Sequence, residues 1–300
     1  MRAQTHTEIY RRFEGELQPR TFRFVPLLTS GIRISAKRKI PLLLLYAPPV
    51  ITTVIFSFIV YGKYAAQDFM ETVTGIEGLT ALPAKIAVQN LQVSRIILNA
   101  NVVLNVFALL AIAWYGSGLF AEDRRLGAQQ LYFARPITRL DYFLGKFLTA
   151  AFFGACAVLL PGVVICLIAA WNSPDWSFLK DEGDIILDTL LYAGVWITVM
   201  SLVVLAVSSL VKRRFFALAG VFAFLFVSNA FALIVARLMN EERVAALSLF
   251  MDLKRIGDHI FDKPSRLPVD ITDAYTFVVS LSVLALAVIA VRLRKLEVVA

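Results

Sequence analysis

The charged residues between Phe120 and Lys146 are the ones best placed to act on another molecule, because they form a dense cluster between two membrane-length apolar runs. Carboxylate and guanidinium groups make ion pairs and charge-assisted hydrogen bonds, so their chemistry here is recognition rather than covalent catalysis. An acidic pair precedes a basic pair, and further bases follow a turn. A short charged segment in that place is suited to contact with another protein, and its charged members include Glu122, Asp123, Arg124, Arg125, Arg135, Arg139 and Lys146.

The local sequence predicts how this segment is built. Ala121–Leu131 contains good helix formers, with acids in its first turn, where the helix dipole favours negative charge. Pro136 ends that helix, because proline disfavours helical backbone in the residue before it. Thr138 and Asp141 then have the spacing of a capping box, so the next helix begins near Arg139. The segment is therefore predicted to be a short, rigid hairpin of helix, turn and helix.

The composition shows what this hairpin is attached to. Apolar residues make up 59% of the chain and charged residues 17%, against about 45–50% and about 25% in soluble proteins. The mean hydropathy is +0.73. Continuous apolar runs of about 20 residues favour transmembrane helices over barrel strands. The predicted fold is all-α and polytopic, with six transmembrane helices and the hairpin between the second and third. The predicted spans are Ile40–Tyr61, Ile96–Phe120, Phe147–Trp171, Ile185–Val211, Phe216–Ala236 and Ala274–Val291.

The placement of Lys and Arg predicts the topology. With the N-terminus inside, 20 of the 30 Lys and Arg residues fall on the inner side, as the positive-inside rule requires. Both termini are therefore expected to be cytoplasmic, with the chain spanning the inner (plasma) membrane several times. The net charge of +8 is explained by this distribution facing anionic lipid, so no nucleic-acid partner is expected.

Two regions follow from the same pattern. Residues 1–39 form a cytoplasmic segment that is too long and charged for a cleaved signal peptide, and Arg20–Lys39 is predicted to be an amphipathic helix at the membrane surface. Residues 40–300 form the transmembrane domain. Its outer loops are expected near 62–95, 172–184 and 237–273, the last with an amphipathic helix within Glu241–Phe261.

Several kinds of activity find no support in the sequence. No P-loop occurs, since Gly145-Lys146 is followed by Phe147 and lacks the earlier glycine. The chain has two histidines, and its two cysteines lie within the third span. These four residues do not have the spacing of a metal site. Hydrolase motifs of the Gly-x-Ser-x-Gly and His-Glu-x-x-His types do not occur. The chain is therefore expected to have no enzymatic activity, cofactor or metal of its own.

Few polar side chains are predicted at membrane depth. Asn101 and Asn105 lie one turn apart on the second span, and Asn229 lies in the fifth. These three are candidates to line a transport cavity, although hydrogen bonding between helices is the more frequent use of such residues. Pro48-Pro49 and Pro161-Gly162 should kink the first and third spans.

The order of residues in the hairpin resembles a known loop. An acidic pair, a basic pair and a glycine are followed by Tyr-x-x-Arg-Pro-x-Thr-Arg-x-x-Tyr-x-x-Gly-Lys. This order is similar to that of the first cytoplasmic loop of type-2 ABC export permeases. The match covers about 27 residues, while the six spans, the inside termini and the basic pre-helix resemble that family across most of the chain. Gln129-Gln130 departs from it, because relatives often carry more apolar residues there.

The resemblance implies a division of labour between chains. In that family the loop docks on a cytosolic ABC ATPase subunit, which binds ATP and Mg, and the permease pairs with a second copy or a paralogue. The resemblance thus implies that this chain is the membrane-spanning part of an exporter. It also implies a docking site formed by Glu122, Asp123, Arg124, Arg125, Gly127, Arg135, Pro136, Arg139, Gly145 and Lys146.

Two other functions are compatible with the sequence. The chain could be a membrane scaffold that anchors a cytosolic or envelope complex through its basic inner surface. It could also be a secondary transporter driven by an ion gradient, but such proteins place charged or unwound elements near the bilayer midplane, and mid-span acids are nearly absent here.

Overall fold

The computed structural model describes residues 22–37, 39–74, 92–133, 137–239, 247–265 and 267–294. Within these ranges the chain is helical apart from short connections, and no strand occurs. Six helices in the described part are long and apolar enough to cross a membrane, which confirms the predicted all-α, polytopic fold. The helices begin and end at α1 Val25–Ala36, α2 Lys39–Thr74, α4 Val93–Leu126, α5 Ala128–Phe133, α6 Arg139–Ala157, α7 Leu159–Asn172, η1 Pro174–Trp176, α8 Ser177–Asp181, α9 Asp184–Leu210, α10 Arg214–Met239, α11 Leu249–Ile260 and α12 Ile271–Arg294.

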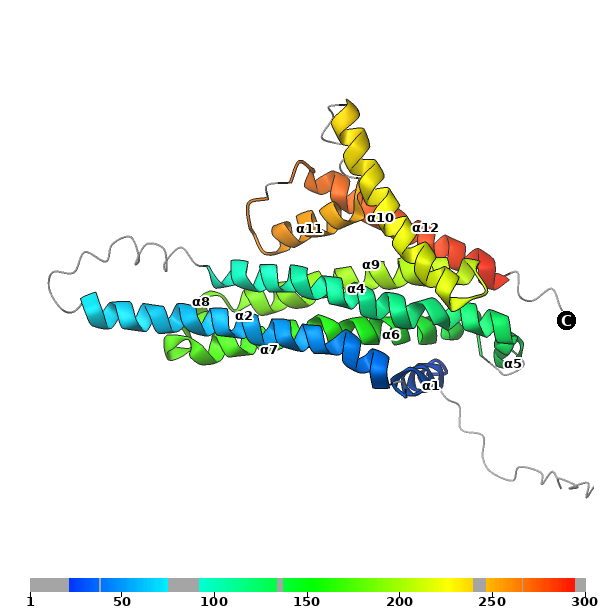
Figure 1. Cartoon of the computed structure of the whole chain (residues 1–300), viewed down its shortest axis with the longest axis horizontal. Helices are drawn as coiled ribbons and strands as arrows, with labels where there is room; N and C mark the ends of the chain where they lie inside the picture. The colour runs from blue at the N-terminus through cyan, green and yellow to red at the C-terminus, as the bar shows by residue number, and fades with distance from the viewer. Residues whose placement is uncertain are drawn as a thin grey trace, which may run out of the picture.

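The helices form an elongated bundle (Figure 1). Helices α2, α4, α6 with α7, and α9 lie side by side along the long axis, while α10 crosses them obliquely. Helices α1 and α5 lie at one end, together with the C-terminal end of α12 (Figure 1). We call this the hairpin end. Helices η1 and α8 lie at the opposite end, the distal end. The first and last described helices therefore meet the same end of the bundle.

Helices α4 and α9 form the centre of the bundle, whereas α2, α10 and α12 are largely exposed around it. Small residues allow the two central helices to approach closely, as is common in membranes. A Cβ atom added to Gly116 of α4 would lie 2.8 Å from a methyl carbon of Val204 on α9. The predicted spans 96–120 and 185–211 thus correspond to the two most enclosed helices.

The third membrane helix is interrupted, as its proline predicts. Helix α6 ends at Ala157, and Val158 has non-helical backbone angles (φ −123°, ψ −47°) before α7 begins at Leu159. Pro161 has no N–H for the carbonyl of Ala157, and its ring crowds that turn. The chain keeps its direction because the Gly162 N–H still donates to the Val158 carbonyl at 2.9 Å. Pro48 and Pro49, in contrast, lie within the continuous helix α2.

The two predicted amphipathic helices are shorter than expected. Helix α1 covers only Val25–Ala36 of the range Arg20–Lys39, because Lys39 already belongs to α2. Helix α11 begins at Leu249. Ser248 is its N-cap, and the Ser248 hydroxyl oxygen accepts the Met251 N–H at 3.4 Å. Residues 240–246 of the predicted helix lie outside the described part.

The predicted outer loops also contain helix. Helix α2 continues to Thr74, well into the segment expected to be a loop from residue 62. The connection 172–184 contains η1 and α8, which fold across the distal end. In the described part of the chain, helical structure therefore extends into both of these segments.

Candidate functional site at the hairpin end

The charged segment forms two helix ends joined by the short helix α5. Helix α4 ends at Leu126, and Gly127 adopts a left-handed conformation (φ 66°, ψ 13°) while its N–H donates to the Asp123 carbonyl. The prediction of one continuous helix over Ala121–Leu131 is therefore wrong. A residue with a Cβ strongly disfavours that conformation, and glycine just past a helix end is the signal that identifies it.

The return helix begins as predicted. The Thr138 hydroxyl oxygen accepts the Asp141 N–H at 3.1 Å, and an Asp141 carboxylate oxygen accepts the Thr138 N–H at 3.1 Å. This reciprocal pair is a capping box, so α6 begins at Arg139. Arg139 is half-buried. Arg135 and Pro136, which were also predicted as contact residues, lie outside the described part.

A buried network fastens the two helices to each other. One carboxylate oxygen of Asp123 accepts from the Lys146 ammonium and from the Tyr142 hydroxyl, both at 2.7 Å. The Gln129 amide donates to the Tyr142 hydroxyl at 3.4 Å. Tyr142 is fully buried, and the Lys146 ammonium lies 5.6 Å from the Tyr132 ring centroid. Asp123 and Lys146 thus hold α4 and α6 together within the hairpin.

The amphipathic helix α1 packs on the same hairpin. A Cβ atom on Gly145 of α6 would lie 2.7 Å from the Leu27 Cβ and 3.3 Å from the Phe24 carbonyl oxygen. Thr149 lies one turn further along α6, and its hydroxyl oxygen would lie 2.8 Å from a Cβ atom added to Gly31 of α1. Gly145 is buried in this helix crossing. Its role in the structure is close packing of α1, a contact that the sequence pattern alone did not reveal.

Polar contacts join the base of the hairpin to the ends of α9 and α10. Arg124 donates to the Ser209 carbonyl at 2.6 Å, which satisfies an otherwise open carbonyl in the last turn of α9. Arg214, at the start of α10, donates to the Trp114 carbonyl at 2.7 Å and lies 4.0 Å from a Glu122 carboxylate oxygen. Glu122 and Arg124 are half-buried by these contacts.

A serine side chain of α9 forms hydrogen bonds with backbone groups of α4 just before the hairpin. The Ser208 hydroxyl donates to the Ser117 carbonyl at 2.8 Å and accepts from the N–H groups of Phe120 and Ala121 at 3.3 and 3.2 Å. Ser208 therefore bridges α9 to the last turns of α4. Serine at a helix contact in a membrane is a recognisable sign of such bonding, although its partner cannot be read from the sequence.

The outward surface of the hairpin combines one base with apolar side chains. Arg125 and Gly127 are exposed, as are Leu126 at the end of α4 and Leu131 on α5. Exposed leucines at a charged loop are unusual for a surface in contact only with water. Leu126 and Leu131 were not among the predicted contact residues, most of which are charged.

The three asparagines lie away from the hairpin. Asn101 is fully buried, and its oxygen would lie 3.1 Å from a Cβ on Gly162. Asn105 is 3% exposed, and its amide atoms have no hydrogen-bond partner among the described residues. Asn229 accepts the Ser248 hydroxyl and so ties α10 to the N-cap of α11. The first two are packed among α4, α7 and α9, and the third joins two helices.

Among the described residues, no group of three or more His, Cys, Asp and Glu side chains is arranged to hold a metal ion. In comparisons with known proteins, no protein-family model and no curated protein matches the chain. The residue order and the geometry of the hairpin end therefore carry the functional argument.

Proposed function

We propose that this chain is the membrane-spanning permease subunit of an ATP-binding-cassette exporter, energised by a separate cytosolic ATPase subunit. In this proposal the hairpin end faces the cytoplasm of a cell with the chain in its inner (plasma) membrane. Two permease chains, identical or paralogous, pair with two ATPases that bind ATP and Mg. This chain carries out no covalent chemistry.

The observation that supports the proposal best is the way the hairpin is fastened. A buried ion pair, a capping box and the crossing with α1 make a stiff unit at the end of the bundle. Because Arg124 and Ser208 connect that unit to α9, a push on its surface would reach both central helices. This is what transmission of a nucleotide-driven movement into a transmembrane bundle requires, since ATP then biases a two-state equilibrium.

Within this proposal, the exposed residues of the hairpin are the ones that we expect to contact the ATPase. Since Asp123 and Lys146 pair with each other, we assign contact with the ATPase to the exposed residues Arg125, Leu126 and Leu131. Leucine side chains would fill an apolar groove on the partner, and Arg125 would pair with a carboxylate at its rim. Apolar anchors with a polar rim are typical of protein interfaces.

Photocross-linking in native membranes tests this assignment. A photoreactive amino acid at Leu131 should capture a soluble chain that carries a P-loop and hydrolyses ATP, and Arg125→Glu should reduce that capture by about tenfold. The same amino acid at Leu179 on the exposed distal surface is the matched control. Equal capture at both positions, or capture of a chain without ATPase activity at Leu131, would refute the permease proposal.

A further inference from the structure

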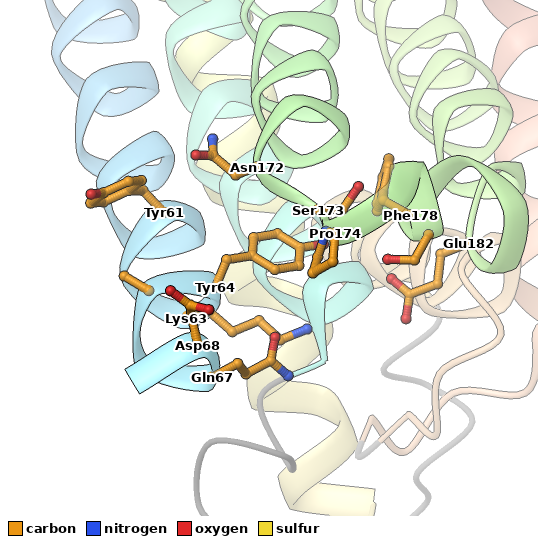
Figure 2. Close-up of a pocket in the computed structure, with 12 residues that line it drawn as sticks. Tyr61, Lys63, Tyr64, Gln67, Asp68, Asn172, Ser173, Pro174, Phe178 and Glu182 are labelled. Atoms are coloured by element: carbon orange, nitrogen blue, oxygen red, sulfur yellow. The ribbon is translucent and has the colours of Figure 1, made fainter. Parts of the chain in front are cut away.

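A polar cavity of about 560 Å³ lies at the distal end, between the second half of α2, the end of α7, η1 and α8. Figure 2 shows side chains from these segments around it. The residues that matter for its chemistry are Tyr61, Lys63, Tyr64, Asp68, Asn172 and Glu182. None of these residues belongs to the hairpin, and the proposed ATPase contact makes no use of them.

An apolar groove of about 340 Å³ continues from this cavity. It runs between α2 and α7 and is lined by Val54, Phe58 and Ile168, with Tyr61 and Asn172 shared between groove and cavity. Val54, Phe58 and Tyr61 are spaced three to four residues apart, so they lie on one face of α2 along the membrane direction. A polar chamber thus opens into an apolar channel of the kind that an acyl chain fills.

The charges of the cavity limit what can occupy it. Within the described part of the chain, the charged residues that line it are Lys63, Asp68 and Glu182. The Lys63 ammonium lies 5.1 Å from the Tyr64 ring centroid and interacts electrostatically with Glu182. The cavity therefore presents both signs of charge, which favours a ligand that brings a positive group together with a negative one.

Hydrogen bonding points to the same kind of ligand. The Asn172 amide nitrogen donates to the Ile168 carbonyl at 2.8 Å, which leaves the Asn172 oxygen as an acceptor at the junction of cavity and groove. The carboxylate of Glu182 is a second acceptor. A primary ammonium can donate to acceptors of this kind, whereas a quaternary ammonium has no N–H to donate.

We propose that the cavity and groove bind a phospholipid whose headgroup carries a phosphate and a primary ammonium, as in phosphatidylethanolamine. Lys63 binds the phosphate, Glu182 accepts from the ammonium, and one acyl chain lies along Val54 and Phe58. The groove distinguishes a lipid from a soluble phosphoethanolamine, because only the lipid has an acyl chain that can pack against it.

Native mass spectrometry of the full-length chain in mild detergent measures this directly. We expect phosphatidylethanolamine to remain bound at concentrations where phosphatidylglycerol, phosphatidylcholine and free phosphoethanolamine do not. Lys63→Glu should weaken retention of phosphatidylethanolamine by about tenfold or more, the loss expected for one charge-assisted hydrogen bond. Lys180→Glu is the matched control, because Lys180 is exposed near the same end but does not line the cavity.

A second pair of variants tests the groove. Val54→Trp should fill it and release the lipid, whereas Ile55→Trp places the same ring at a neighbouring, similarly exposed position outside it. Equal retention by these two variants, equal binding of the three phospholipids, or equally tight binding of free phosphoethanolamine would overturn the proposal. The assay needs no ATPase, so its failure would leave the permease function standing, and failure of the cross-linking experiment would leave this site standing.

Discussion

Asp252 gives the sharpest test of the structure, because a buried carboxyl group without a partner should control stability through its proton. It lies on α11, outside the six membrane-spanning helices, and its exposed fraction is 0%. Neither carboxylate oxygen has a hydrogen-bond partner among the described residues. Burial, and then the nearby charge of Asp273, raise the pKa of Asp252 from 3.8 to about 8. The folded protein therefore holds this side chain as a neutral acid at pH 7.

The sign of the pH dependence follows from that shift. Between pH 3.8 and about 8 the folded state binds one proton more than the unfolded state does, so the free energy of unfolding falls as pH rises. The stabilisation is complete below the unfolded pKa and is lost as the pH passes the folded one. A full proton corresponds to about 1.4 kcal/mol per pH unit, so we expect a slope approaching about 1.4 kcal/mol per pH unit between the two pKa values.

Thermal unfolding in detergent between about pH 5 and pH 9 measures this slope. Asp252→Asn keeps the side chain neutral at every pH, so the variant should lose most of the decline seen in the wild type and be the more stable of the two at high pH. Asp262→Asn is the control, because Asp262 is exposed and asparagine tolerates its left-handed backbone. A wild-type slope in Asp252→Asn would refute the assignment of a buried, neutral acid.

Three further predictions concern the hairpin end. Lys146→Met should cost about 3 kcal/mol by leaving the buried Asp123 carboxylate unpaired; adding Asp123→Asn should recover part of that loss in denaturant unfolding, and an additive double variant would contradict the pairing. Gly127→Ala should lower the unfolding free energy by about 1 kcal/mol because of its left-handed conformation, and no loss would argue against that turn. Gly145→Leu should displace α1. The displacement would be measured as a longer distance between spin labels at the exposed positions Ile34 and Leu140. Gly194→Leu is the control and should leave that distance unchanged, because a Cβ added to Gly194 meets nothing within 4 Å.

The sequence predicted the local features of the fold well. Apolar length identified all six membrane helices, because a helix must be continuously apolar to cross the bilayer. The capping box at Thr138 and the break before Pro161 were also expected, since each depends on residues within one or two turns. The break at Gly127 was missed, although a glycine just past a helix end was a sufficient signal.

The roles of individual hairpin residues could not be predicted in the same way. The family resemblance implied a docking role for Asp123 and Lys146, and nothing in the sequence indicated that they pair with each other. The structure pairs them across two helices, a contact that depends on how α4 and α6 cross rather than on spacing along either. Gly145 is explained only by the approach of α1, a separate helix distant in sequence. Long-range packing of this kind leaves no periodic signal in a single sequence.

The same contacts bear on how a movement at the hairpin would spread. Arg124 and Ser208 bind the hairpin base to the end of α9, and the Gly145 crossing binds it to α1. A force that moves the end of α4 away from α6 would break the Asp123–Lys146 pair, at a cost of about 3 kcal/mol. Moving the hairpin as a unit with α4 and α9 keeps those contacts. We infer that the stiff connection makes a shift of the central helices the easier response to force on the hairpin.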